Sequence, residues 1–531
     1  MVQNVSRILW LAVAAVVLID GGQGANILGL FTSLSPSHLI IQMSVAKALA
    51  ERGHNVTVVS VLKPDITHKD INVIQVPLSK EDTEHLSGLF EKMGKNNDKN
   101  MLVAMFRMFG HMRFMFHKIA DALKDTRVRD LYVNKDYSFD LVLSGFALNY
   151  YQMGFAQKVK APVIVVATSQ PWLLLNNLIG NPEELSYVPD LNDSVEKGKG
   201  MTFRQRLINY LMGIGYKVFA KITERRNKMV YKELFGDDPH MPEYSEMMKN
   251  ASLVFCASHA ISEGPIRPNV PGVIEIGGIQ VKDTPTPLPP NIEEFLGNAM
   301  DGAILLSLGS NVQGLHLSPD TVQKMFNVLS KLKQRVIWKW EDLDKTPGKS
   351  ENILYSKWLP QDDILAFSKI KLFINHAGKG GITEAQYHGK PMLSMPLFSD
   401  QPANADAMFK KGFGLTLSLL TLEEQSFREA IKEILGNPKY SLAVSTFSKL
   451  YRDRPLTARE SVIYWSEYVI RHRGAAHLQS PLVHMSFVAA NNFDVYALLA
   501  IILVFFLLLT KAVIKLINRG LSSKPKKAKT H

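Results

Sequence analysis

The clearest chemistry in this sequence of 531 residues is a glycine-rich turn at residues 376–381, which begins with His376. It follows an apolar stretch of strand length, residues 371–375, and precedes an expected helix over residues 382–388 that Gly389 would end. The first amides of a helix are unpaired and lie at the positive end of its dipole, so the turn is suited to bind an anion. Taken alone, such a turn more often serves to pack a helix on a strand.

The residues around the turn make the anion-binding interpretation specific. Trp358-Leu-Pro-Gln361 precedes the turn, Glu384 lies in the expected helix, and Asp400-Gln401 follows it. This run, residues 358–404, resembles the signature of the UDP-glycosyltransferases, a family that includes vertebrate glucuronosyltransferases and insect UDP-glucosyltransferases. The resemblance covers nearly the whole chain and is densest over residues 276–481.

The resemblance implies a role at each position of the signature. In the family, the Trp stacks on uracil, the Gln contacts the nucleoside and the Glu binds the ribose. The His and the glycine-rich turn hold the pyrophosphate, and the Asp-Gln pair binds sugar hydroxyls. These UDP-sugar-binding roles fall on Trp358, Gln361, Glu384, His376, Gly378, Gly381, Asp400 and Gln401, with Ser310 as a further hydroxyl donor after the strand expected from residue 303.

Two positions of the turn depart from the family pattern. Ala377 stands where the family commonly has Gly, and Gly380 stands where it commonly has Asn or another polar residue. A side-chain contact to phosphate is therefore lost at Gly380, and only its backbone amide remains.

A second candidate site lies near the amino end. Residues 26–31 form an expected strand, residues 38–52 a helix and residues 56–60 a second strand, with a polar loop after the first strand. Ligands bind at this carboxyl edge in open parallel sheets. On residue type alone, His38 would be a residue at the start of a helix with no functional role. Ser37-His38 matches the family's Ser-His pair, so the resemblance implies that His38 is the catalytic base.

The partner of this base is missing from its usual place. A strand is expected over residues 139–143, and the family usually has an orienting Asp directly after it, where this chain has Ser144-Gly145. Asp140, at the start of the strand, is a poor substitute. Loss of an orienting carboxylate slows general-base chemistry by orders of magnitude. A catalytically weak binder of lipophilic ligands or of UDP-sugar is therefore the alternative to an enzyme.

The two ends of the chain indicate targeting. Arg7 and an apolar run over residues 8–19, followed by small residues, predict a secretory signal peptide. Residues 495–510 carry no charge and, extended to residue 517, predict a membrane-spanning helix. Seven basic residues lie between Lys511 and Lys529, and they supply more than half of the net charge of +12. We interpret them as a cytosolic flank of the span and not as a nucleic-acid patch.

These features predict a single-pass type I protein of the endoplasmic reticulum membrane, with a lumenal body and a cytosolic tail. Lys527 and Lys529 resemble a dilysine retrieval signal. In a lumenal body, the sequons at Asn192 and Asn250 are candidate glycosylation sites. The single cysteine, Cys256, excludes an internal disulfide and is expected to be a buried thiol.

The proline-rich run over residues 281–290 is the clearest domain boundary. The fold class implied is α/β of the GT-B type, with two facing Rossmann-like, doubly wound domains and a C-terminal transmembrane helix. The expected parts are a signal peptide (1–24), an acceptor-binding domain (25–280), a linker (281–300), a UDP-sugar-binding domain (301–450), closing helices that return to the first domain (451–485), a membrane helix (495–517) and a basic tail (518–531). An amphipathic helix over residues 454–472 matches the family's closing helix. Thr421 and Glu424 predict a capping box for an earlier helix.

The predicted activity is inverting transfer of a hexose from a UDP-sugar to a hydroxyl or similar nucleophile of a small lipophilic acceptor. UDP-glucose is the favoured donor, because the sequence looks more like the insect branch, and UDP-glucuronate is second. No metal and no cofactor besides the UDP-sugar co-substrate is expected.

The Met- and Phe-rich residues 81–128 are either a wall of the acceptor pocket, a membrane contact or helical core. A homo-oligomer and a third function, membrane adaptor, are left open.

Overall fold

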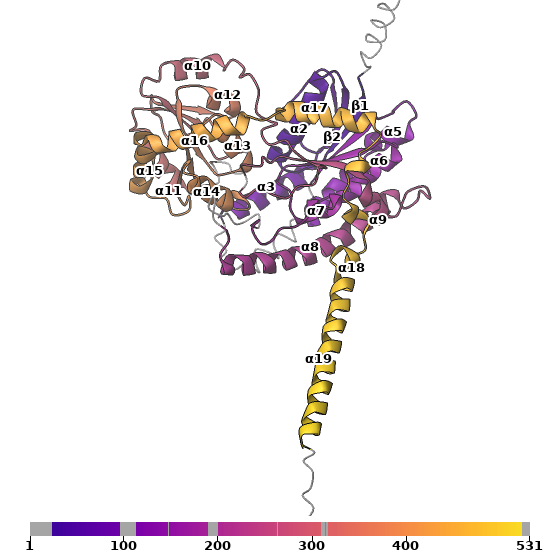
Figure 1. The fold of residues 1–531 in the computed structure, drawn as a ribbon. Helices are drawn as coiled ribbons and strands as arrows, with labels where there is room; N and C mark the ends of the chain where they lie inside the picture. Colours follow the sequence, from indigo (N-terminus) through magenta and orange to yellow (C-terminus); the bar gives the residue numbers. More distant parts are fainter. Residues whose placement is uncertain are drawn as a thin grey trace, which may run out of the picture. The chain divides into compact units, whose positions relative to one another are not determined.

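The computed structural model describes residues 24–95, 113–146, 148–189, 200–262, 264–309, 314 and 317–522. The chain divides into two compact units, residues 1–479 and residues 480–531, and both β-sheets of the protein lie in the first unit (Figure 1). All the strand pairs in both sheets are parallel. The expected α/β class with two Rossmann-like sheets is confirmed.

The first sheet has seven strands in the order β3-β2-β1-β4-β5-β6-β7. Its central strands are continuous runs of buried apolar residues, as expected where helices cover both faces of a parallel sheet. The strands are β1 Asn26–Phe31, β2 Asn55–Ser60, β3 Ile71–Gln75, β4 Leu141–Gly145, β5 Val163–Ala167, β6 Ala251–Cys256 and β7 Val273–Glu275.

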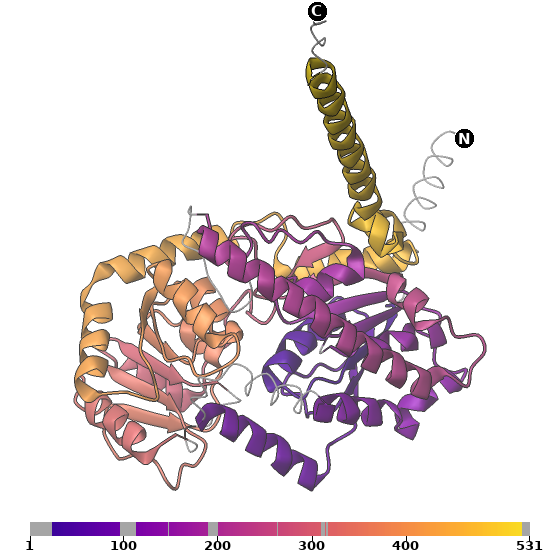
Figure 2. The ribbon, with the colours of Figure 1, turned by 90° about the horizontal axis from the view of Figure 1, so that it is seen from below.

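Helices of very different lengths accompany this sheet. Helix α2 has Pro36 at its first position, where a missing N–H costs nothing, and ten of its residues are buried. The helices are α2 Pro36–Glu51, α3 Lys80–Lys95, α5 Thr126–Val133, α6 Gly154–Lys158, α7 Leu173–Ile179, α8 Phe203–Phe235 and α9 Tyr244–Met247. The 33-residue helix α8 begins with a capping box formed by Thr202 and Gln205, and Figure 2 shows it as one unbroken helix in magenta.

The second sheet has six strands in the order β10-β9-β8-β11-β12-β13. These are β8 Ala303–Ser307, β9 Arg335–Lys339, β10 Ile353–Ser356, β11 Ile370–Asn375, β12 Met392–Ser394 and β13 Gly414–Thr416. The helices that accompany it are α10 Pro290–Gly297, α11 Pro319–Leu329, α12 Gln361–Ala366, α13 Lys379–Tyr387, α14 Gln401–Lys410, α15 Glu424–Gly436 and α16 Pro438–Arg452.

After the second sheet, the chain returns to the first one. Helix α17, Ala458–Arg471, packs along α2, and two ion pairs join them: Arg459 to Glu51 at 2.6 Å and Glu467 to Arg52, just beyond the end of α2, at 3.1 Å (Figure 1). Partly exposed pairs of this kind contribute little stability, so the buried apolar residues of α17 carry most of the contact.

Some local expectations were wrong. Helix α13 begins at Lys379, three residues earlier than the apolar pattern predicted, so the glycine-rich turn forms its first turn. Thr421 and Glu424 do not form a capping box, because α15 begins at Glu424 with Glu423 at its N-cap and no side-chain cap. The capping box of this region belongs to α17, between Thr457 and Glu460.

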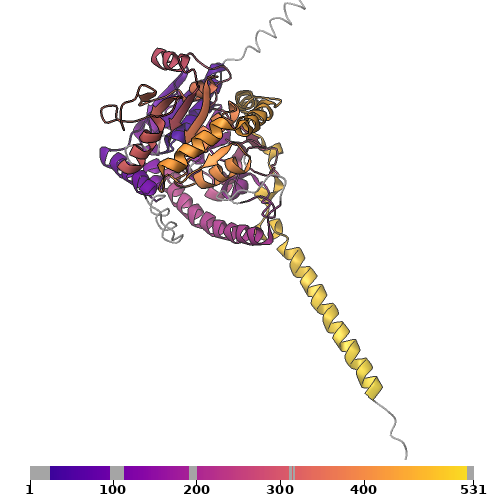
Figure 3. The same cartoon turned by 90° about the vertical axis from the view of Figure 1, so that its left-hand side faces the viewer.

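The second unit contains the short helix α18, Phe487–Ala490, and the helix α19, Phe493–Ser522. Figure 3 shows α19 as one long helix. Residues 493–521 are long and apolar enough to cross a membrane, since about 20 residues suffice, and none of the most apolar stretch is buried. The predicted C-terminal apolar helix is therefore present. The expected signal peptide and most of the basic tail lie outside the described residues.

Candidate active site

Both sheets reverse their strand order at one point, and the candidate residues gather there. In the first sheet the reversal lies between β1 and β4, and in the second between β8 and β11. His38 follows β1 and His376 follows β11 directly. Ligands of open α/β sheets bind at this switch point, outside the carboxyl ends of the strands.

The imidazole of His38 has a hydroxyl partner in its own loop. Its Nδ1 lies 3.2 Å from the Oγ of the buried Ser33, and this Oγ also accepts the backbone N–H of Ser35 at 3.2 Å. Burial lowers the pKa of His38 below its ordinary value, and the carboxylate of Asp400 raises it in part. His38 is therefore neutral at pH 7, as a general base must be. Asp400 follows β12 of the second sheet, so this interaction joins the two predicted halves of the site.

The space of the missing orienting Asp is filled by Gln42. A Cβ added at Gly145 would lie 2.6 Å from Nε2 and 2.8 Å from Cδ of Gln42. Gln42 lies one helical turn after His38 and is fully buried, and neither of its amide atoms has a hydrogen-bond partner among the described residues. Asp140 is not a substitute, because its carboxylate accepts the backbone N–H of Asn26 at the opposite end of the sheet.

A buried polar network that the sequence did not reveal fixes the loops after β1 and β4. The Gln152 amide donates to Ser144 Oγ at 2.9 Å and to the carbonyls of Gly145 and Leu30 at 2.8 and 3.2 Å. Its Oε1 accepts from Thr32 Oγ1 at 3.0 Å, next to Ser33 in the loop that carries His38. Asn149 joins the network through both Thr32 and Gln152. The contacts of this network with Thr32 and Leu30 span about 120 positions of sequence, so no local pattern could indicate them.

In the second sheet, His376 is packed between two glycines. A Cβ at Gly309 would lie 2.5 Å from Cε1 of His376, and a Cβ at Gly378 would lie 2.4 Å from its Nε2. Both glycines are therefore required by the imidazole. Burial and the nearby Lys339 ammonium lower the pKa of His376 to about 4, and its buried Nδ1 has no partner among the described residues. A neutral imidazole with a free ring nitrogen can donate to an anionic ligand at the start of α13.

The departure at Ala377 has a backbone consequence. Ala377 has a φ of 62°, in the left-handed region that favours glycine, and it is fully buried. Its N–H is bound by Asn375 Oδ1 at 2.7 Å and its carbonyl by Asn404 Nδ2 at 3.1 Å. Asn404 also donates to Asp400 Oδ2 at 2.7 Å. The same side chain thus links the phosphate-side turn to the residue predicted to bind the sugar.

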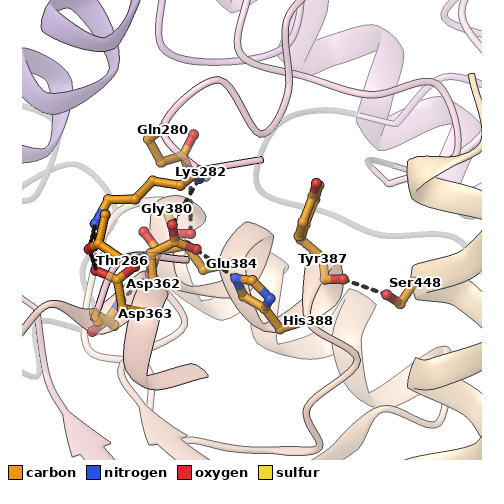
Figure 4. A network of polar contacts seen from close by, with 11 residues as sticks. Gln280, Lys282, Thr286, Asp362, Asp363, Gly380, Glu384, Tyr387, His388 and Ser448 are labelled. Atoms are coloured by element: carbon orange, nitrogen blue, oxygen red, sulfur yellow. Dashed lines mark hydrogen bonds and ion pairs between the residues drawn. The ribbon is translucent and has the colours of Figure 1, made fainter. Parts of the chain in front are cut away.

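The structure brings Gln361 and Glu384, the predicted nucleoside and ribose residues, into direct contact. The Nε2 of Gln361 donates to Glu384 Oε2 at 2.6 Å. Burial, and next the carboxylate of Asp362, raise the pKa of Glu384 to about 8, against the hydrogen bond from Gln361. Figure 4 shows Glu384 on α13 with Gly380 beside it and Gln280 above.

A second group that the sequence did not reveal joins the linker to α12. Asp362 accepts the backbone N–H of Lys282 at 2.8 Å and contacts Nε2 of His388 at 2.6 Å, while Asp363 pairs with the Lys282 ammonium and accepts from Thr286 at 2.7 Å (Figure 4). These bonds hold the chain between the sheets against the helix that begins with Gln361.

The remaining candidates differ in their readiness for a ligand. The Trp358 ring is 62% exposed, as a stacking surface requires. Gln401 is buried, and its Oε1 accepts the N–H groups of Leu397 and Phe398 at 2.9 and 3.2 Å, so only its amide nitrogen is available to a sugar. Gly381 lies in the first turn of α13, next to Phe373 and Gln361.

Several predicted residues cannot be placed or remain untested. Ser310 and Asn192 lie outside the described residues. Asn250 is exposed at the end of a short 3-10 helix, and Cys256 is buried, as expected. No group of three or more metal-binding side chains occurs within the described ranges. The described part of the Met- and Phe-rich segment includes Phe116 in the main core of the first sheet.

Fold and site define a two-domain nucleotide-binding protein of the GT-B type, with a histidine from one sheet and a phosphate-side turn from the other. The family model for UDP-glucoronosyl and UDP-glucosyl transferase matches residues 28–527. The chain belongs to this UDP-glycosyltransferase family and is a glycosyltransferase, which transfers sugar from a UDP-sugar to an acceptor.

Relatives and solved structures agree with this assignment. UDP-glucosyltransferase 2 of Dactylopius coccus is 34% identical over 89% of this chain and 89% of its own length. UDP-glucuronosyltransferase 2B1 of Rattus norvegicus is 29% identical over 88% and 89%. A UDP-glucosyltransferase from Polygonum tinctorium, solved in complex with 3,4-dichloroaniline, matches 85% of this chain and 98% of its own with a TM-score of 0.55 and 17% identity, a likeness of fold.

Proposed function

We propose that the protein transfers glucose from UDP-glucose, with inversion, to a hydroxyl of a small lipophilic acceptor, and that His38 is the base. The observation that carries this proposal is that His38 and His376 follow the strands at the switch points of the two sheets, and the Asp400 carboxylate of the second half also raises the pKa of His38. It supports a site in which the base of one sheet and the sugar-binding residues of the other act on a single hexose.

In the proposed step, the hydrogen atom of His38 is on Nδ1 and forms a hydrogen bond to Ser33 Oγ. The other ring nitrogen, Nε2, is therefore unprotonated and can accept a proton. The acceptor oxygen attacks the anomeric carbon while its proton moves to Nε2. The bond from that carbon to the UDP oxygen breaks, and UDP leaves with the electron pair. The proton is later released to solvent, which restores the neutral base.

The charge that develops on UDP would be met by the start of α13. The first-turn amides of this helix and the positive end of its dipole face the predicted pyrophosphate position, and His376 adds a donor. Trp358 would stack on uracil, and Glu384 with Gln361 would bind the ribose and base. This arrangement needs no metal ion to offset the leaving-group charge.

UDP-glucose is proposed as the donor because an insect UDP-glucosyltransferase is a 34% identical relative, and UDP-glucuronate is the second candidate. We further propose that the protein is a single-pass type I protein of the endoplasmic reticulum, anchored by α19, and that Asn192 and Asn250 carry glycans on the lumenal side. An endoglycosidase shift of the expressed protein, lost in Asn192→Gln and Asn250→Gln, tests the topology.

Activity is tested on microsomes that contain the full chain, with radiolabelled UDP-glucose, UDP-glucuronate or UDP-galactose and a panel of phenols. We expect glucoside product that His38→Ala abolishes, while His240→Ala, an exposed histidine, leaves it unchanged. UDP binding without product from any donor and acceptor would overturn the proposal in favour of the weak binder. Product that persists in His38→Ala would overturn the role of His38.

A further inference from the structure

The long helix α8 exposes the apolar side chains of its first half. Over residues 203–227 its buried positions are Asn209, Gly213, Thr223 and Asn227, and only its last turns bury apolar side chains, which are Val230, Tyr231 and Phe235. Phe203, Leu207, Tyr210, Leu211, Ile214 and Val218 are between 47% and 73% exposed. A helix of a soluble body normally buries its apolar face, so an exposed stripe of this size indicates a contact surface.

Specific hydrogen bonds hold the polar face inward. The Asn209 amide donates to the carbonyls of Leu185 and Val188, each at 2.8 Å. Asn227 donates to the carbonyl of Leu148 at 2.9 Å and accepts the N–H of Tyr151 at 3.1 Å. The buried polar side and the apolar side chains buried in the last turns therefore hold α8 in place, and the exposed apolar stripe of its first half contributes little.

The exposed side chains on this face of α8 change from apolar to basic along the helix. Continuing from Val218 with alternating steps of three and four residues, the next positions are Lys221, Arg225, Lys228 and Lys232, all exposed. Residues at this spacing share one face, so the α8 stripe is apolar over residues 203–218 and basic over residues 221–232. Lys221 pairs with Glu224 at 2.8 Å, while Arg225, Lys228 and Lys232 make no ion pair with a described residue.

We propose that the α8 stripe docks on the surface of an anionic lipid bilayer. The apolar half would lie at the boundary of headgroups and acyl chains, and the basic half would contact lipid phosphates. The charge pattern favours this occupant over a second copy of the chain, because two basic segments would repel each other. The proposal rests on the proposed anchoring by α19, which keeps a bilayer at high local concentration.

Lipid contact is measured on the full chain in vesicles, with a fluorophore on single introduced cysteines. The native thiol interferes little, because Cys256 is fully buried and burial raises its pKa. Leu211→Cys and Val218→Cys report on the stripe, Leu442→Cys on an exposed apolar site of α16, and Val504→Cys on α19. Wild-type protein gives the labelling blank.

Spin-labelled lipid should quench the probes at positions 211 and 218 at least about twofold more than the probe at 442. This quenching should increase with phosphatidylserine and decrease when Arg225→Glu and Lys228→Glu are added. Quenching at 504 but not at 211 and 218 would overturn the docking while leaving the anchor intact. Disulfide cross-linking of two chains through position 211 would overturn it in favour of a dimer, and no quenching at 504 would remove the anchoring on which it rests.

Discussion

Ser33 Oγ lies 3.2 Å from Nδ1 of His38, so the hydrogen-bond partner of this imidazole is a hydroxyl and not the carboxylate expected from the family pattern. A neutral hydroxyl can hold the ring and its tautomer, but it stabilises the imidazolium formed during proton transfer less than a carboxylate does. If His38 is the base, as proposed, Ser33 would orient it but would give up part of the charge stabilisation that a carboxylate supplies.

We expect Ser33→Ala to lower kcat by about 10-fold to 100-fold, less than the loss of the base itself, because the ring would lose its partner but keep its place in α2. The KM for the UDP-sugar should change little, since Ser33 lies in the other sheet from the nucleotide site. Ser33→Thr keeps the hydroxyl and should restore most of the activity. Steady-state kinetics with a fixed phenol measure both values, and an unchanged kcat in Ser33→Ala would remove Ser33 from the mechanism.

Two fully buried glutamines near the base should respond in opposite ways to the same substitution. Gln42 has no hydrogen-bond partner among the described residues, so Gln42→Leu should stabilise the protein by about 1–3 kcal/mol, the cost of an unsatisfied buried polar group. Gln152 makes five hydrogen bonds, and Gln152→Leu should be destabilising by about 3 kcal/mol or more.

Thermal unfolding of the two variants in the same detergent gives the comparison. Equal destabilisation by both substitutions would show that Gln42 has a partner in the folded protein. A gain of stability with a loss of activity would instead show that the Gln42 amide serves the reaction, in the place that Gly145 leaves empty.

The outline of the fold could be predicted from the sequence, because strands such as β5 and β8 are almost entirely apolar runs. The signature around His376 could be recognised because its residues lie close together in the chain. Ser33, Gln42 and Gln152 could not be found in this way. Their importance depends on partners that folding brings together, as Thr32 and Gln152 show across 120 positions.

Helix α8 escaped prediction for a different reason. Apolar periodicity indicates a helix through the face that it buries, and over residues 203–227 α8 buries asparagine, threonine and glycine, with buried apolar residues only in its last turns. Its buried polar groups are paired with backbone carbonyls of the neighbouring loop, which no rule of periodicity anticipates.

The electrostatic effect of Asp400 on His38 predicts a shift in the pH profile. The Asp400 carboxylate raises the pKa of His38, and Asp400→Asn removes this charge, so the pKa should fall. A histidine acts as a base only when it is neutral. The pKa of His38, as the proposed base, therefore sets the pH at which kcat/KM falls on the acidic side of the profile. The limb should therefore move to lower pH in Asp400→Asn, even if the activity falls throughout because sugar binding is weaker.

Asp406→Asn is the matched control, because Asp406 lies in α14, the helix for which Asp400 is the N-cap residue, and pairs with Lys410 at 2.6 Å. It should leave the limb in place. An acidic limb that stays unchanged in Asp400→Asn would mean that the two residues do not interact in the working enzyme, and that the two halves of the site lie too far apart for one hexose.

Glu384 should make the ligand-free protein less stable as the pH rises. Its pKa in the folded state is about 8, whereas an unfolded Glu has a pKa near 4.5. Between these two values the folded state binds more protons than the unfolded state, so the free energy of unfolding falls with increasing pH.

Glu384→Gln removes this titration. We expect the variant to raise Tm by a few degrees at pH 8 and to change it little at pH 4.5, while it weakens UDP binding. Glu351→Gln, an exposed carboxylate, should alter neither property. A Tm difference for Glu384→Gln that is the same at both pH values would contradict a raised pKa, and tight UDP binding by the variant would contradict its predicted contact with the ribose.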